Sequence, residues 1–130
     1  MDARAVAERF RTAVEGGHLE GVVELLAPTA ILNSPVSFQP FRGAETVALV
    51  LRAVSEVFEE FRYVDALEGE ETFALFFQAK VGDKEVTGVD LFRATGDGRI
   101  AELTVLIRPL SGLIALAEAM GPKVAELTKA

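Results

Sequence analysis

Apolar residues recur at helical spacing in four stretches of the chain. In the first, Val6, Phe10 and Val14 follow one another every four residues behind Asp2, a residue type that caps helix N-termini. Gly16-Gly17 ends this helix. The same reasoning predicts three further helices: a short one over residues 19–26, a long one over 44–61, and a final one that Ser111 caps and that runs to about Thr128. The apolar stripe of the final helix contains Leu113, Ile114, Ala117 and Met120.

The remaining segments are rich in β-forming residues and are separated by turn signals. Turns are predicted at Glu68-Gly69, at Gly82-Asp83 and at Gly96-Asp97-Gly98. They divide the second half of the chain into an antiparallel meander of four strands, and an earlier strand precedes the long helix. The five strands are expected over residues 30–34, 62–67, 72–81, 85–94 and 100–108. This order of elements predicts an α+β fold in which helices cover the concave face of a curved, mainly antiparallel sheet.

The predicted strands carry apolar residues on both faces. In the strand 72–81, Phe77 alternates with Phe76, and in the strand 100–108, Ile107 alternates with Leu106. The helices can cover only the concave face. We therefore expect a second copy of the chain to cover the convex face, in a homodimer formed through the sheet.

Composition narrows the class of protein. The length of 130 residues fits a single domain, and 50% hydrophobic residues with nine Phe is enough apolar mass to line a cavity or an interface as well as a core. A formal charge of −7 argues against a nucleic-acid partner, which needs clustered Lys and Arg. The chain has no Cys, no signal-like N-terminal segment and no apolar run long enough for a membrane span, so we expect a cytoplasmic protein with no membrane partner.

Three segments resemble the nuclear transport factor 2-like superfamily. They read AVEGGHLEGVVELLAPTAILNSPV, then PFRGAE where the long helix begins, then GVDLFRATGDGRIAEL. Their order and spacing resemble the SnoaL-like branch and its relatives, the ketosteroid isomerases. The resemblance implies one SnoaL-like domain over residues 1–130, with a cone-shaped fold that encloses an apolar pocket. The final helix, at about 111–128, lies outside the ketosteroid isomerase pattern. Because this fold hosts several enzyme classes and non-catalytic carriers, the resemblance does not specify the function.

Residue by residue, the resemblance argues against ketosteroid isomerase activity. Those enzymes place an Asp base just before the Pro of the first strand, a Tyr on the first helix and a buried Asp near the end of the chain. The corresponding residues here are Ser34, Phe10 and Asp90. A serine without an adjacent base does not remove a proton from carbon, and Phe10 lacks the hydroxyl that would stabilise an enolate. Only the buried acid of the pattern is present.

Asp90 is the candidate catalytic residue. Strand alternation places it on the same face as Gly88 and Phe92, and the resemblance implies that this face is concave. A carboxyl in an apolar pocket would have a raised pKa and would act as an acid/base or hydrogen-bond donor. The alternative is an exposed carboxylate, or one paired with Arg93 or Arg108.

The other candidate residues are expected to line the pocket or to orient a ligand, and not to take part in a reaction. We expect apolar pocket lining from aromatic and aliphatic residues on several elements, namely Phe10, Phe38, Phe58, Tyr63, Phe77, Phe92 and Ile107. Asn33 and Ser34, at the end of the first strand, are expected to orient a ligand, although both are also common at strand ends. With His18 as the only histidine, a Ser–His pair or a metal site is not expected, and neither is a cofactor.

Three functions remain open from the sequence. The leading hypothesis is that the domain binds a small apolar or ring-containing molecule in its central pocket. The second is an enzyme of the isomerase, cyclase or dehydratase type that uses Asp90 as acid/base. The third is a structural or interaction module in which the pocket has no ligand.

Overall fold

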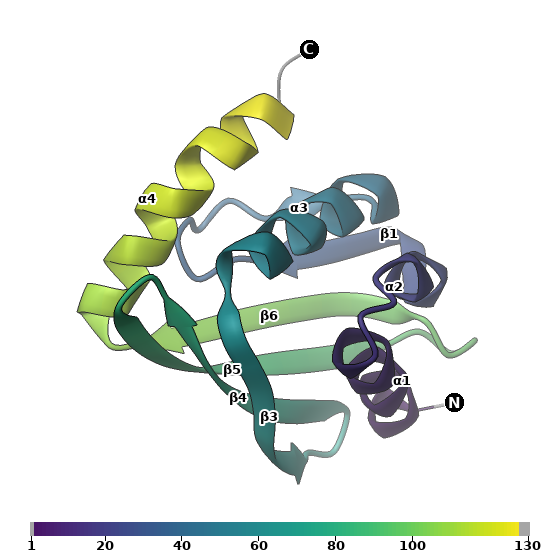
Figure 1. Ribbon diagram of the computed structural model, residues 1–130. Coiled ribbons are helices and arrows are strands. Elements are labelled where there is room, and N and C mark those ends of the chain that lie inside the picture. The colour runs from purple at the N-terminus through teal and green to yellow at the C-terminus, as the bar shows by residue number, and fades with distance from the viewer. Residues whose placement is uncertain (1, 128–130) are drawn as a thin grey trace.

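A curled six-stranded sheet with helices on its inner side makes up the computed structural model, which describes residues 2–127 (Figure 1). The strands lie in the order β2-β1-β6-β5-β4-β3. The helices are α1 (Ala3–Glu15), α2 (Glu20–Leu25), α3 (Ala44–Val57) and α4 (Leu110–Leu127). The strands are β1 (Leu26–Asn33), β2 (Phe41–Arg42), β3 (Glu59–Glu68), β4 (Thr72–Val81), β5 (Lys84–Ala94) and β6 (Ile100–Arg108). The predicted α+β class, with helices on a curved and mainly antiparallel sheet, is confirmed.

The meander from β3 to β6 is antiparallel throughout, with Phe76 opposite Val89 and Val89 opposite Leu106. The sequence did not predict that β1 pairs parallel with β6, nor that β2 pairs with β1. Strand β6 lies about 70 residues beyond β1 along the chain, so no local turn signal connects the two. Their pairing depends on the helices that bring β1 back to the sheet.

The boundary between α3 and β3 differs from the prediction. The helical stripe of the sequence continues through Phe58 and led to an expected helix end at residue 61, whereas α3 ends at Val57. The backbone N–H of Phe58 still donates to the carbonyl of Val54, but the Phe58 backbone is extended and β3 begins at Glu59. Phe58 packs against the core whether its backbone is helical or extended. The spacing of apolar residues therefore did not distinguish a helix from a strand at this position.

Irregular pairing in β3 curls the sheet. The register of β3 on β4 shifts between Glu59 and Arg62 and again between Tyr63 and Asp65. Such bulges bend a strand and increase its twist. Figure 1 shows β3 crossing in front of the other strands, with α1, α2 and α3 on the same side of the sheet. The resulting concave face holds the largest buried side chains, among them Phe77 and Phe92.

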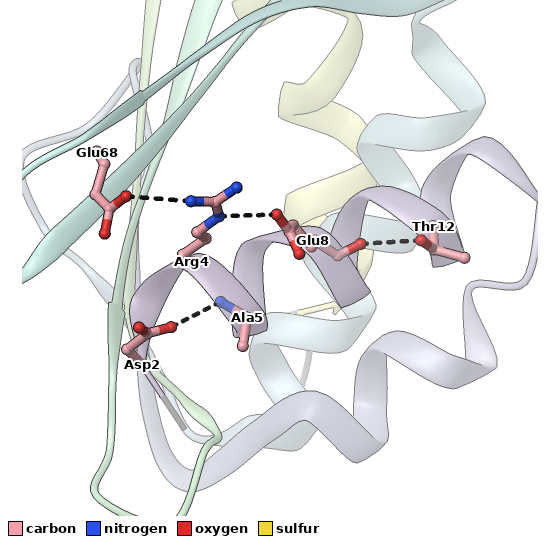
Figure 2. Close-up of polar contacts among 6 residues, drawn as sticks. All are labelled: Asp2, Arg4, Ala5, Glu8, Thr12 and Glu68. Atoms are coloured by element: carbon pink, nitrogen blue, oxygen red, sulfur yellow. Dashed lines mark hydrogen bonds and ion pairs between the residues drawn. The ribbon is translucent and has the colours of Figure 1, made fainter.

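The N-terminal helix begins as the sequence predicts, because the Oδ1 atom of Asp2 accepts a hydrogen bond of 3.0 Å from the backbone N–H of Ala5 (Figure 2). The guanidinium of Arg4 contacts Glu8 at 3.1 Å and reaches Glu68 of β3 at 3.5 Å (Figure 2). Both ion pairs are exposed, so each contributes little to stability. They nevertheless connect the start of α1 to the end of β3.

The C-terminal helix packs differently from its prediction. It begins at Leu110, so Ser111 lies within the first turn and does not cap it. The buried residues of this helix are Gly112, Leu116 and Met120, whereas Ile114, which the sequence placed on the apolar stripe, is 48% exposed. A Cβ atom at Gly112 would clash with Val86 of β5, and this close approach determines which face of α4 is inward.

The predicted end of the helix at Thr128 lies outside the described residues. Within residues 2–127, no helix is both long and apolar enough to cross a lipid bilayer.

Candidate functional site

A cavity of about 560 Å3 lies between the concave face of the sheet and helices α1, α3 and α4. Its size is within the range of small-molecule sites. The helical side of the wall is mainly apolar and includes Val14, Val50, Leu51, Val54, Leu116, Met120 and Val124. The sheet side includes Tyr63, Phe77, Asp90, Val105 and Ile107.

Four aromatic rings form one wall of the cavity. The ring of Phe61 stacks on that of Phe77, with their centroids 4.8 Å apart, and meets Tyr63 edge-on at 5.0 Å. Phe58 contacts both Phe61 and Phe77 at 5.5 and 5.6 Å between centroids. Each ring restrains its neighbours in these arrangements. The wall therefore presents a rigid apolar surface to any molecule in the cavity.

Gly88 makes room for this aromatic wall. It lies opposite Phe77 in the pairing of β5 with β4, and a Cβ atom at Gly88 would clash with the Phe77 ring. Without a side chain at this position, the outer edge of the Phe77 ring approaches the backbone of β5 closely. A larger residue would push Phe77 toward the cavity.

Asp90 is the one charged side chain buried in the described part of the chain, at 6% exposure. Its Oδ2 atom accepts a hydrogen bond of 3.0 Å from the hydroxyl of Tyr63. On the concave face its cross-strand neighbours are Leu75 of β4 and Val105 of β6, which offer no polar partner. The other carboxyl oxygen, Oδ1, makes no hydrogen bond to a described residue.

The free oxygen of Asp90 opens toward the cavity. Among residues 2–127, every fully buried side-chain nitrogen or oxygen has a hydrogen-bond partner. Since the Oδ1 atom has none, it is not fully buried, and Asp90 is part of the cavity wall. A ligand polar group can therefore reach this oxygen while Tyr63 holds the other one.

Burial controls the protonation of this pair. Loss of hydration raises the pKa of Asp90 to about 7, and the hydrogen bond from Tyr63 opposes that rise. Burial, together with the nearby Asp90 carboxylate, raises the pKa of Tyr63 well above its usual value. Near neutral pH, Asp90 therefore exchanges between an acid that donates and a carboxylate that accepts, while Tyr63 keeps its proton.

An ion pair on α1 continues this arrangement toward solvent. The guanidinium of Arg11 lies 5.7 Å from the centroid of the Tyr63 ring. Its Nε atom contacts the Oε2 atom of Glu15 at 3.2 Å. Glu15 lines the cavity with its side chain 48% exposed. Glu15, Arg11, Tyr63 and Asp90 thus run in sequence from the surface to the interior.

Most of the residues named from the sequence lie in the cavity wall. The structure brings together Phe10, Ser34, Phe58, Tyr63, Phe77, Asp90 and Ile107. Neither basic alternative for Asp90 is its hydrogen-bond partner. Arg93 lies on the outer side of the sheet, where it contacts Glu71 at 3.6 Å and Glu102 at 3.8 Å.

Three of the named residues lie outside the cavity wall. The side-chain amide of Asn33 donates hydrogen bonds to Glu102 at 2.7 Å and to Thr104 at 2.9 Å. Asn33 pairs with Thr104 of β6 and lies on the convex face of the sheet. Phe38 is fully exposed in the irregular loop between β1 and β2. Its prediction as a lining residue was wrong because a loop has no periodicity that indicates which side chains point inward. Phe92 is on the concave face but is completely buried behind Phe10, at 5.0 Å between ring centroids.

A tyrosine hydroxyl lies beside Asp90, although the family resemblance placed no tyrosine there. Phe10 has no hydroxyl, and the Ser34 oxygen accepts hydrogen bonds from the backbone N–H groups of Val36 and Ser37, both at 3.2 Å. The phenol beside Asp90 comes from Tyr63 on β3. The sequence named Tyr63 only as lining, because the shifted register of β3 hides which strand residue faces Asp90.

The sequence did not name several wall residues. Glu15 follows the apolar stripe of α1 and precedes Gly16-Gly17, and a charged residue at a helix end is ordinarily solvated. On α4 the predicted stripe contained Ala117 and Met120, and both line the cavity, although the pattern of this helix does not indicate where it packs.

The chain matches the family model described as the SnoaL-like domain over residues 7–103. It belongs to this family. The match covers most of the chain and includes most of α1, all of β1 and the strand that carries Asp90.

Two relatives are named as steroid isomerases. A steroid Delta-isomerase from Nocardioides simplex is 27% identical over 112 residues, which cover 83% of this chain and 91% of that protein. The crystal structure of a steroid delta-isomerase from Pseudomonas aeruginosa is 37% identical, with a TM-score of 0.89 over 95% of this chain and 92% of that one.

A third relative is an uncharacterised bacterial protein with a cystatin-like fold from Silicibacter pomeroyi. It is 33% identical, with a TM-score of 0.87 over 92% of this chain and 85% of that one. These similarities confirm the predicted nuclear transport factor 2-like fold and a relationship to steroid isomerases.

Proposed function

We propose that the SnoaL-like domain binds a small, mainly apolar, ring-containing molecule whose oxygen atom is held by Asp90 and Tyr63. The observation that supports this most strongly is the buried carboxyl of Asp90, which has one oxygen occupied by Tyr63 and the other open to the cavity. A buried charge without a second partner is unfavourable in an otherwise finished core. A ligand oxygen would provide that partner.

The shape and chemistry of the wall support the same class of ligand. Stacked rings of Phe61 and Phe77 offer a flat apolar surface beside the polar pair. At neutral or lower pH the protonated Asp90 donates to a carbonyl or hydroxyl oxygen. Above the pKa of Asp90, only ligands that can donate a proton to the carboxylate remain well matched.

A second candidate function is isomerisation of a cyclic ketone. Two relatives of the chain are steroid isomerases, and Asp90 together with Tyr63 would stabilise the negative oxygen of an enolate. Ser34, however, stands where ketosteroid isomerases have their Asp base, so this function requires a base at another position.

Titration with β-naphthol, a fluorescent bicyclic phenol, tests the binding function. We expect saturable binding by the wild-type protein, and a 10- to 100-fold weaker affinity for Tyr63→Phe and Asp90→Asn, because each change removes or alters a hydrogen bond to a charged or buried group (about 1.5–3 kcal/mol). Naphthalene has the same apolar body without the oxygen, so its affinity should change little in either variant.

Asp65→Asn is the matched control, since it makes the same chemical change at an exposed position of β3. It should bind β-naphthol like the wild type. Binding that is unaffected by both Asp90→Asn and Tyr63→Phe would contradict the proposed anchor, and no binding of either aromatic would contradict the proposed ligand class.

A further inference from the structure

The C-terminal helix closes one side of the cavity. The wall residues that α4 contributes are Leu116, Ala117, Met120, Gly121 and Val124. All of them lie beyond residues 7–103, the part of the chain that matches the family model. This side of the cavity is therefore built by a segment outside the matched region.

The mouth of the cavity lies beside the distal part of α4. Among the described residues of the wall, those that remain exposed mark the opening to solvent, and they are Glu15, Gly17, Val36, Ser37, Ser55 and Gly121. Next to Ser55 and Gly121 along the chain, the Nζ atom of Lys123 contacts the Oε2 atom of Glu56 at 3.9 Å. This partly exposed ion pair joins α4 to α3 at the rim of the cavity.

The backbone of α4 is interrupted where the helix reaches this rim. Pro122 lies inside the helix and has no N–H, so the usual hydrogen bond to the carbonyl of Glu118 is missing. Gly121 precedes it, and glycine is among the least favourable residues in a helix interior. A Cβ atom at Gly121 would meet no atom of another described element within 4 Å, so close packing does not account for the glycine.

The segment beyond this interruption covers the cavity. Val124 lines the wall, and Leu127 packs against the core. Figure 1 shows the C-terminal end of α4 extending past α3 and away from the strands. A movement of this end would therefore open the cavity without disturbing the sheet.

We propose that residues 122–127 form a hinged cover, which opens at Gly121-Pro122 to admit and release the ligand. The ion pair between Lys123 and Glu56 favours the closed position. A cover of this kind sets the rates of binding and release, because the ligand passes only while the cover is open. This proposal rests on the proposed function, in which the cavity holds a ligand.

Stopped-flow fluorescence with β-naphthol tests the hinge. Gly121→Ala should slow association and dissociation about fivefold each, the factor that corresponds to the higher helix propensity of Ala. The dissociation constant should stay within about twofold of the wild type, because the cover is closed in both the free and the bound protein. Pro122→Ala restores the missing N–H and should slow both rates at least about tenfold.

Gly21→Ala is the matched control for the hinge. It makes the same change within α2, outside the cavity wall, where the new Cβ atom would lie 3.8 Å from Ala13 in an ordinary contact. Both rates should equal those of the wild type.

Glu56→Gln tests the ion pair. It should raise both rates about twofold, since a partly exposed pair contributes little. High salt should bring the wild-type rates to those of this variant, because β-naphthol is uncharged at neutral pH and salt then acts on the pair. Glu8→Gln, which breaks the exposed pair with Arg4 instead, is the control and should leave the rates unchanged (Figure 2).

The outcomes separate this proposal from the binding function. If β-naphthol binds but Gly121→Ala and Pro122→Ala keep the wild-type rates, residues 122–127 are not the cover and the binding function stands. Slower association without slower dissociation would also overturn the proposal, because the substitution would then have changed the wall and not the opening. Wild-type rates in Glu56→Gln would overturn the role of the ion pair.

Hydrogen exchange of the free protein tests the hinge without any ligand, so it decides even if β-naphthol does not bind and the proposed function fails. The backbone amides of residues 124–127 should exchange together as one unit, and about fivefold more slowly in Gly121→Ala. Exchange rates that rise gradually from residue 124 to residue 127, which is the pattern of ordinary fraying, would overturn the hinge.

Discussion

The two faces of the sheet are formed by the same strands, but one is covered by helices and the other is the outer surface. On the concave face, Leu75, Asp90 and Val105 lie side by side across β4, β5 and β6, and Asp90 and Val105 line the cavity. On the convex face the next row is Phe76, Val89 and Leu106, and Leu106 is 56% exposed. A single residue step along each strand changes a side chain from cavity wall to outer surface.

The charged groups of the two faces show what this difference means. On the outer face, Arg93 shares its charge with Glu71 and Glu102 in partly exposed pairs, which contribute little and leave the charges hydrated. On the inner face, Asp90 is buried and has only the Tyr63 hydroxyl as a partner among the described residues, and its burial raises its pKa to about 7. Coverage by the helices, rather than residue type, gives the buried Asp90 a raised pKa, whereas the acids of the outer face remain hydrated.

The largest expected effect is on the free energy of unfolding and comes from comparing two adjacent phenylalanines, one on each face of the sheet. Phe77→Ala should lower the free energy of unfolding by about 3–5 kcal/mol, because the Phe77 ring is 1% exposed and stacks on Phe61. Phe76→Ala, its control on the outer face, should lower it by about 1 kcal/mol or less at concentrations where the chain is monomeric. Urea unfolding measures both. Equal losses would mean that the faces do not differ in packing.

A smaller effect is expected on how the stability of the protein depends on pH, because Asp90 changes its protonation state. Its raised pKa means that the folded state binds a proton more tightly than the unfolded state, whose Asp has a pKa of about 3.8. The stabilisation from the protonated group is fully present below that value and is lost as the pH rises through about 7.

Relative to Asp90→Asn, the wild type should therefore lose about 3 kcal/mol between about pH 4 and pH 8. Denaturant unfolding at several pH values measures this trend, and Asp65→Asn should show no such difference. A wild type that gains stability over Asp90→Asn as the pH rises would indicate a carboxylate held by a positive charge instead.

The smallest expected effect on stability, and the one that tests the outer face itself, concerns Leu106. We propose that the row Phe76, Val89 and Leu106 is covered by a second copy of the chain. Leu106→Lys should abolish the dimer and change the stability of the monomer by less than about 0.5 kcal/mol. Light scattering should give about twice 14.0 kDa for the wild type and one chain mass for the variant.

Ile114→Lys, at an exposed position of α4, is its control and should remain dimeric. A wild type with the mass of a single chain would show that the outer row stays uncovered.

The sequence by itself determined the strands of the meander, the start of α1 and the face on which Asp90 lies. Each of these depends on local signals: Gly-containing turns, the Asp2 cap, and the alternation that groups Asp90 with Gly88 and Phe92. The class of fold followed from the order of the elements, and the family resemblance implied that the face with Asp90 is the concave one.

Only the tertiary structure decided which side chains meet in the cavity. The Tyr63–Asp90 hydrogen bond joins residues 27 positions apart and depends on the bulged register of β3, for which the sequence has no signal. The position of Glu15 in the wall depends on how the end of α1 packs over the sheet. Phe38 is the opposite case: it was predicted to line the cavity, yet it is exposed, because periodicity does not orient side chains in a loop. Periodicity reports which face of an element is apolar, whereas contact between elements depends on register, curvature and packing over long separations.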